Sequence, residues 1–193
     1  MTTFYVVRHG NTELNYKGVL MGHIDSPLTD QGYNDAFFLA KKLKKIKFNA
    51  IFSSDLGRAF ITAHIIADAF GLTNSIFRDK ALREIDFGDL TGKIREEVRG
   101  SYDKIKSNAR NMAPGGESYL DVKKRIVNNL LGLSKKSYKN ILMVTHAGCI
   151  RVIIAEALNK KLDELLKREI SHRFIGKFDI KNGKIRNFKI VNE

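Results

Sequence analysis

Three segments of the chain place polar, chemically competent side chains directly after a short apolar run. They read Val6-Val7-Arg8-His9-Gly10, Ile51-Phe52-Ser53-Ser54-Asp55-Leu56-Gly57-Arg58 and Met143-Val144-Thr145-His146-Ala147-Gly148. Such apolar runs are typical of buried strands, and sites in open parallel sheets form beyond the carboxyl ends of the strands. If the three strands are neighbours, the histidines and arginines of these segments converge on one crevice.

These side chains suit phosphoryl transfer better than metal binding. Guanidinium groups form bidentate, charge-assisted hydrogen bonds with phosphate oxygens, whereas unshielded arginines beside the two histidines would repel a divalent cation. The spacing of a zinc or magnesium cage is also missing. A neutral imidazole nitrogen is a competent nucleophile toward phosphorus, and a covalent intermediate divides the reaction into two easier steps.

The departing oxygen of a phosphate ester needs an acid that protonates it. Glu84 and Asp86 both lie in a loop-rich stretch from Arg83 to Gly92. Residue type and position alone leave both carboxylates open as that acid.

The apolar pattern predicts the elements that position these groups: a three-layer α/β/α sandwich around a mostly parallel sheet with an antiparallel edge hairpin. Strands are expected at 4–7, 50–52, 75–77, 141–144, 174–180 and 185–191, the last two joined by the hairpin signal Asn182-Gly183. Helices are expected after Thr29 as N-cap, at 56–70 with Gly71 as C-cap, and at 93–109, 117–134 and 149–158. Without a linker or repeat, residues 1–193 are expected to form one domain, with 93–113 as a substrate-covering segment.

Composition excludes several classes of protein. An apolar share of 43% rules out disorder as the main state, and one cysteine cannot form an internal disulfide. No run of about 18 apolar residues could span a bilayer, and the first residues lack the pattern of a signal peptide. We therefore expect a cytoplasmic protein with no membrane partner.

The chain is strongly basic, with 34 Lys and Arg against 21 Asp and Glu, a net charge of +13. The basic residues form short clusters beside helical patterns, without a basic tail, a zinc-finger spacing or an RNA-recognition motif. The charge thus suits a small anionic substrate, and no nucleic acid partner is expected. The oligomeric state stays open between a monomer and a homodimer.

The ordered motifs of the chain resemble the histidine phosphatase superfamily, also called the phosphoglycerate mutase-like family. The resemblance rests on blocks in the family's order, which cover most of the chain to about residue 150: Arg8-His9-Gly10-Asn11-Thr12 with Glu13 and Asn15, Asp25-Ser26-Pro27-Leu28-Thr29 with Gly32, Ser53-Ser54-Asp55-Leu56-Gly57-Arg58-Ala59, Leu82-Arg83-Glu84 with Phe87-Gly88, Pro114-Gly115-Gly116-Glu117-Ser118 and Thr145-His146-Ala147-Gly148.

The resemblance implies a role for each matching position. His9 would be the phosphorylated nucleophile, and Glu84 aligns with the family's proton donor in preference to Asp86. The pocket around the phosphoryl group would consist of Arg8, Arg58 and His146, with Asn15 as a further donor. No metal or organic cofactor is required by this chemistry. His172 matches no block and is interpreted as incidental.

The predicted function is metal-independent hydrolysis of a small phosphorylated metabolite through phosphohistidine. One alternative is a phosphoglycerate mutase-type phosphoryl transfer, although such mutases carry inserted segments that exclude water and that a chain of 193 residues lacks. A more distant alternative is a non-catalytic module that binds phosphate groups or nucleic acid. A module that only binds phosphate groups would not require both His9 and Glu84, so their joint presence favours an enzyme.

Overall fold

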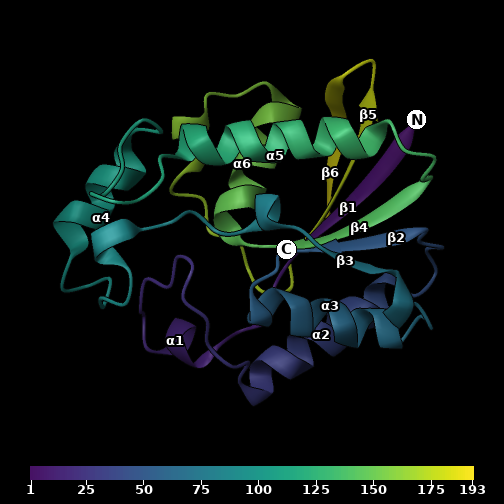
Figure 1. Cartoon of the computed structure of the whole chain (residues 1–193), viewed down its shortest axis with the longest axis horizontal. Coiled ribbons are helices and arrows are strands. Elements are labelled where there is room, and N and C mark those ends of the chain that lie inside the picture. Colours follow the sequence, from purple (N-terminus) through teal and green to yellow (C-terminus); the bar gives the residue numbers. More distant parts are fainter.

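The computed structural model describes residues 1–193 as a six-stranded sheet with helices on both faces (Figure 1). The strands, in chain order, are β1 (Thr2–Arg8), β2 (Ala50–Ser53), β3 (Ile76–Arg78), β4 (Asn140–Thr145), β5 (Ile175–Lys181) and β6 (Lys184–Asn192). Their order across the sheet is β3-β2-β4-β1-β5-β6. The first four strands of that order pair in parallel, whereas β5 and β6 are antiparallel. The predicted fold class is confirmed.

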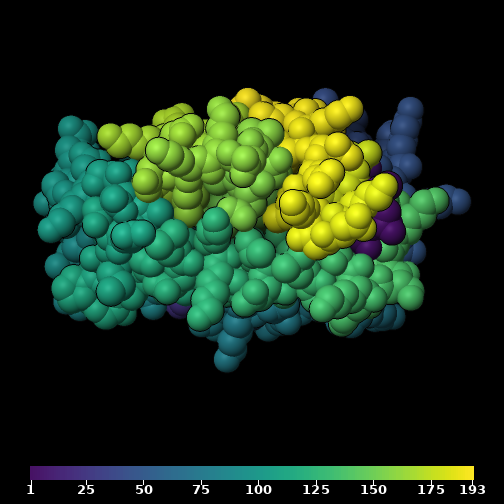
Figure 2. Space-filling model, turned by 90° about the horizontal axis from the view of Figure 1, so that it is seen from above, coloured from purple at the N-terminus to yellow at the C-terminus, as the bar shows by residue number.

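Two layers of helices cover the sheet. The helices are α1 (Glu13–Tyr16), α2 (Asp30–Leu43), α3 (Gly57–Asp68), α4 (Arg99–Ser107), α5 (Tyr119–Ser134) and α6 (Ala147–Leu158). In Figure 1, α2 and α3 lie below the sheet and α5 and α6 lie above it. Viewed from above in Figure 2, the segment around α4 (teal) lies toward one end of the molecule and the β5–β6 hairpin (yellow) toward the other. None of these helices combines the length and apolarity that a membrane crossing requires.

The position of β1 between two layers of helices explains why Phe4-Tyr5-Val6-Val7 is continuously apolar. Phe4 and Val6 point into the larger of two buried clusters, which includes side chains of α5 and α6. Tyr5 and Val7 point into the smaller cluster, which includes side chains of α2 and α3. Because successive side chains of a strand point to opposite faces, a strand buried on both faces has no polar alternation.

Capping residues fix where the helices begin. The side chain of Thr29 accepts a hydrogen bond from the backbone of Gly32, as its predicted N-cap role requires. Leu56, the residue before α3, has no polar side-chain atom that could accept a hydrogen bond from the start of the helix. Instead, the carboxylate of Asp25 accepts hydrogen bonds from the backbone N–H groups of Gly57 and Arg58. This contact joins the loop around residue 25 to the first turn of α3.

The helix predicted at 93–109 is shorter in the structure, because α4 begins only at Arg99. The backbone before it is bonded elsewhere: Leu20 donates to the carbonyl of Lys93, and Arg95 donates to the carbonyl of Gly18. Backbone groups held by another segment are not available to a helix. The prediction was therefore wrong for residues 93–98, which form a connection of turns that is hydrogen-bonded to residues 18–20.

Candidate active site

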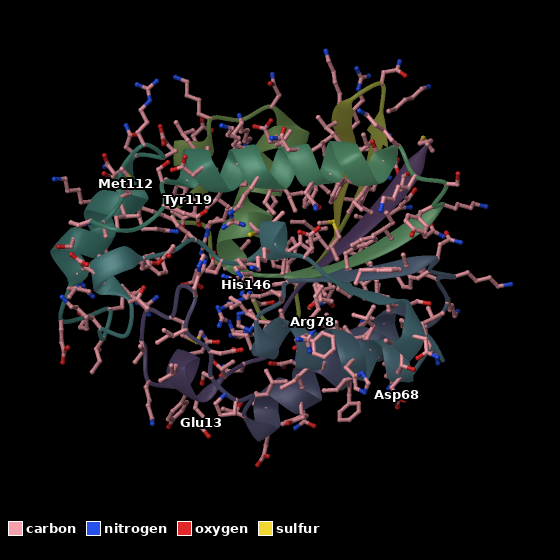
Figure 3. The ribbon with its side chains drawn as sticks, in the orientation of Figure 1. Glu13, Asp68, Arg78, Met112, Tyr119 and His146 are labelled. Atoms are coloured by element: carbon pink, nitrogen blue, oxygen red, sulfur yellow. The ribbon has the colours of Figure 1, made fainter.

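The carboxyl ends of β1 and β4 place two histidine rings side by side. His9 follows β1 and His146 follows β4, and the two strands pair in parallel. The ring centroids lie 5.0 Å apart, and the residues are 2% and 0% exposed. In Figure 3, His146 lies near the middle of the molecule, between the helices that cover the two faces of the sheet.

The surroundings of His9 leave one of its ring nitrogens free. Nδ1 lies 2.8 Å from the carbonyl oxygen of Gly10 and donates to it, so the lone pair is on Nε2. Burial, followed by the electrostatic effects of His146, Arg58 and Arg8, lowers the pKa of His9 well below 6.5. The ring is therefore neutral at physiological pH, which is its nucleophilic form.

Arg58, in the first turn of α3, is 1% exposed. Its guanidinium donates to the carbonyl oxygens of Ile24 at 2.7 Å and Gly22 at 2.9 Å, and lies 3.3 Å from the carboxylate of Asp25. Burial lowers its pKa, but a guanidinium in a protein stays protonated. Nε of Arg58 has no partner in the protein. The loop around residue 25 thus orients a buried positive charge.

Arg8 and Asn15 add further polar groups to the same place. Arg8 ends β1 and donates from Nη1 to the carbonyl of Ile170. Burial lowers the pKa of Arg8 to about 10, which still leaves the group charged at neutral pH. The Oδ1 atom of Asn15 accepts a hydrogen bond from Thr12 at 3.0 Å, so its amide nitrogen is the group left for a ligand.

Glu84 is held by the first turn of α6. Gly148 N–H lies 3.0 Å and 3.2 Å from the two carboxylate oxygens of Glu84, and Ile85 N–H donates to Oε1 at 3.0 Å. Asp86 is bonded elsewhere, since it accepts from Gly88 N–H at 2.9 Å and lies 3.5 Å from His23. Of these two carboxylates, only Glu84 lines the cavity that His9 lines.

His172 is a third histidine beside His9. Its Nδ1 donates to the carbonyl oxygen of His9 at 2.7 Å, and the two ring centroids are 5.4 Å apart. Burial lowers the pKa of His172 to about 4, so the ring is neutral. The sequence, from which His172 is interpreted as incidental, did not predict this contact with His9. No periodicity or motif marks it, because only the fold of the segment before β5 brings it to β1.

Arg125 on α5 fixes the loop that carries Glu84. It donates to the carbonyl oxygens of Ala81 at 2.8 Å, Arg83 at 2.7 Å and Glu84 at 2.9 Å. Glu117 pairs with this guanidinium at 2.9 Å and also accepts from the backbone N–H of Asp86. Arg125 occurs in an ordinary helical pattern, so the sequence contains no signal of this contact.

The polar groups form one end of a cavity of about 560 Å³. Arg8, His9, Asn15, Arg58 and Glu84 line it, whereas His146, beside His9, is fully buried. The remainder of the wall includes apolar side chains and groups from the segment around α4. No group of three or more His, Cys, Asp and Glu side chains is arranged to hold a metal ion. The polar end of the cavity thus combines the guanidinium groups of Arg8 and Arg58 with the neutral imidazole of His9 and the carboxyl group of Glu84.

Comparisons with known proteins connect this geometry to one family. The profile described as the histidine phosphatase superfamily (branch 1) matches residues 4–192. A 2,3-bisphosphoglycerate-dependent phosphoglycerate mutase of Mesorhizobium japonicum is 32% identical to the chain over 179 residues, which cover 87% of each protein.

Two solved structures share the fold along the whole chain. YhfR of Bacillus stearothermophilus has a TM-score of 0.88 and 30% identity, covering 100% of this chain and 96% of that one. A phosphoserine phosphatase mutant from Entamoeba histolytica, in complex with phosphoserine, has a TM-score of 0.83 and 28% identity, with the same coverage of both chains.

Proposed function

The chain belongs to the histidine phosphatase superfamily, and we propose that it hydrolyses small phosphate monoesters through a phosphohistidine on His9. The observation that carries this proposal is the neutral His9 ring at the polar end of a cavity also lined by Arg8, Arg58 and Glu84. A nucleophile, positive groups and a carboxyl group within one cavity are the parts that phosphoryl transfer needs.

In the first step, Nε2 of His9 attacks phosphorus and the bond to the ester oxygen breaks. Arg8, Arg58 and His146, with Asn15, stabilise the charge on the phosphoryl oxygens. Both ring nitrogens of His146 and one nitrogen of each arginine lack a partner in the protein, which supports this role. Glu84 gives its proton to the departing alkoxide, so the alcohol leaves neutral.

In the second step, water attacks the phosphorus of phosphohistidine and the P–N bond breaks. Glu84, now a carboxylate, accepts the proton of that water. Inorganic phosphate leaves, and His9 returns to its neutral form with the lone pair on Nε2. The sum of the two steps is hydrolysis of the ester, with no net change in the enzyme.

The contact between Glu84 and α6 gives a first prediction. A Cβ atom on Gly148 would clash with Oε1 of Glu84, so Gly148→Ala must displace the carboxylate. We expect kcat to fall by about 10- to 100-fold, because catalysis is sensitive to displacements of about 1 Å. Gly132→Ala is the matched control, since its Cβ meets nothing within 4 Å. Equal kcat values for both variants would contradict the assigned position of Glu84.

Hydrolysis of p-nitrophenyl phosphate in the presence of EDTA tests the proposed function as a whole. We expect phosphate release at the same rate with and without the chelator, because every group in the proposed mechanism belongs to the protein. A rate abolished by EDTA would contradict metal-independent chemistry. Inactivity of the intact protein toward a broad panel of phosphate esters would favour the non-catalytic binding alternative.

A mutase is the second candidate function, favoured by the 32% identity to a phosphoglycerate mutase. A mutase must return the phosphoryl group to a second hydroxyl before water reaches it. Incubation of the protein with 3-phosphoglycerate and a trace of 2,3-bisphosphoglycerate distinguishes a mutase from a phosphatase. The 2-isomer would indicate a mutase, and inorganic phosphate a phosphatase.

The proposal also includes the domain organisation, the cellular location and the partners of the protein. Residues 1–193 act as one histidine phosphatase-like domain, and the segment 93–113 covers the substrate. The position of Arg95 and Tyr102 in the cavity wall supports that role. The expected location is the cytoplasm, with no nucleic acid partner and either a monomer or a homodimer.

A further inference from the structure

The backbone carbonyl of Glu84 accepts hydrogen bonds from two distant parts of the chain. Nη2 of Arg125, on α5, donates to this oxygen at 2.9 Å, and Nε2 of His23 also lies 2.9 Å from it. Because a carbonyl oxygen only accepts, Nε2 of His23 carries the hydrogen. The oxygen has two lone pairs, so these two donors occupy it fully. Glu84 is thus held at its backbone as well as at its carboxylate.

The two donors differ in how much else they hold. Arg125 also donates to the carbonyls of two other residues of this loop and pairs with Glu117, so it supports the loop as a whole. The ring of His23 makes one hydrogen bond, to Glu84. Its Nδ1 lies 3.5 Å from the carboxylate of Asp86, and its side chain is 28% exposed. A change at His23 therefore removes a single contact with the loop of the proton donor.

The loop that carries His23 is anchored on Arg58. Gly22 and Ile24, the residues on either side of His23, accept hydrogen bonds from the buried guanidinium at 2.9 Å and 2.7 Å. A Cβ atom on Gly22 would lie 3.0 Å from the backbone nitrogen of Phe87, so the two loops pack closely there. The backbone on both sides of His23 thus contacts the phosphate-binding arginine, whereas the side chain of His23 contacts the proton donor.

His23 is placed to hold Glu84 and not to react. It does not line the cavity, so it is not among the groups that meet a substrate there. The carboxylate of Glu84 is held by the N–H groups of Gly148 and Ile85, but Ile85 belongs to the same segment and moves with Glu84. A separate contact at the Glu84 backbone limits that movement. Catalysis is sensitive to displacements of about 1 Å, so such a contact has kinetic consequences.

We infer that His23 is a positioning residue for Glu84. Its hydrogen bond to the Glu84 carbonyl fixes the backbone from which the carboxyl group reaches the departing oxygen. This inference rests on the proposed function and adds one residue to it. The loop at 22–25 then serves both halves of the site, since its backbone orients Arg58 and its histidine orients Glu84.

His23→Leu tests this role, because it removes the donor and keeps an apolar side chain of similar size. We expect kcat/KM for glycerol 3-phosphate to fall by about 10-fold, the effect of one lost hydrogen bond. The value for p-nitrophenyl phosphate should change by less than about twofold, since its phenolate leaves without a proton. His23→Gln should retain both values, because the amide nitrogen of glutamine can reach the place of Nε2. The matched control is His64→Leu, a change at an exposed histidine of α3 that should alter neither value.

A double-mutant cycle shows whether His23 acts through Glu84. In a Glu84→Gln background no proton donor remains to be positioned, so His23→Leu should cause no further loss toward glycerol 3-phosphate. An effect transmitted through Arg58 would instead lower kcat/KM for both substrates and would add to the loss in Glu84→Gln.

The outcomes separate this inference from the proposed function. Unchanged kcat/KM in a folded His23→Leu protein, an equal loss toward both substrates, or a loss that adds to that of Glu84→Gln would overturn the role of His23 alone. If circular dichroism shows that His23→Leu is unfolded, His23→Asn, whose shorter amide does not reach the Glu84 carbonyl, replaces it in the same cycle. Failure of the unchanged protein to hydrolyse any phosphate ester would overturn the proposed function itself.

Discussion

His9→Ala is expected to lower kcat by about 10⁴-fold or more for every phosphate ester, because the variant has no group that can form the covalent intermediate. His9 is 2% exposed, and burial together with positive neighbours keeps its ring neutral. No other histidine can replace it easily, since neither His146 nor His172 lines the cavity. The measurement is phosphate release under saturating substrate.

The matched control for this change is His64→Ala, a histidine on the solvent side of α3 that the mechanism does not use. We expect it to retain the activity of the unchanged protein. Circular dichroism of both variants shows whether a loss reflects unfolding. A folded His9→Ala protein with more than a tenth of the original kcat would contradict nucleophilic catalysis by His9.

Glu84→Gln is expected to lower kcat/KM by about 10²- to 10⁴-fold for alkyl phosphates, which need a proton on the leaving oxygen. The amide can still occupy the place beside Gly148 N–H, but it cannot donate a carboxyl proton. With p-nitrophenyl phosphate, the leaving phenolate is stable without a proton, so the loss should be much smaller. The dependence on the leaving group distinguishes a proton donor from a residue that only positions the substrate.

The comparison variant for this prediction is Asp86→Asn, the second carboxylate that residue type alone left open. Asp86 contacts Gly88 N–H and His23 and does not line the cavity. We expect a change in kcat/KM of less than about 10-fold, without dependence on the leaving group. The opposite order of effects at residues 84 and 86 would contradict the assigned proton donor.

The layers of the fold could be predicted from the sequence because the strong local signals agree with the tertiary structure. The run Phe4-Tyr5-Val6-Val7 is apolar at every position, as a strand between two layers of helices must be. Asn182-Gly183 marks the β5–β6 hairpin, and both residues have the positive φ angles that this turn needs. The meeting of His9 with His146 follows from the same logic, since their strands end at one edge of the sheet.

The remaining features depend on contacts between distant segments. The helix prediction for 93–98 was wrong because residues 18–20 hold the backbone of that stretch. His172 reaches His9 only through the path of the connection before β5, and Arg125 reaches the Glu84 loop only through the packing of α5. Neither residue lies in a motif whose spacing encodes its partner. The roles of the site residues in catalysis stay predictions that the variants above test.

The central claim is a covalent phosphoryl group on His9, and rapid-quench mass spectrometry tests it most directly. Turnover with p-nitrophenyl phosphate is stopped within milliseconds under conditions that avoid acid, because phosphoramidates hydrolyse in acid, and the protein is digested and sequenced. The account predicts one added phosphoryl group on the peptide that contains His9, and its absence in His9→Ala. An active protein that never carries this adduct, or that carries it on another residue, would contradict the account.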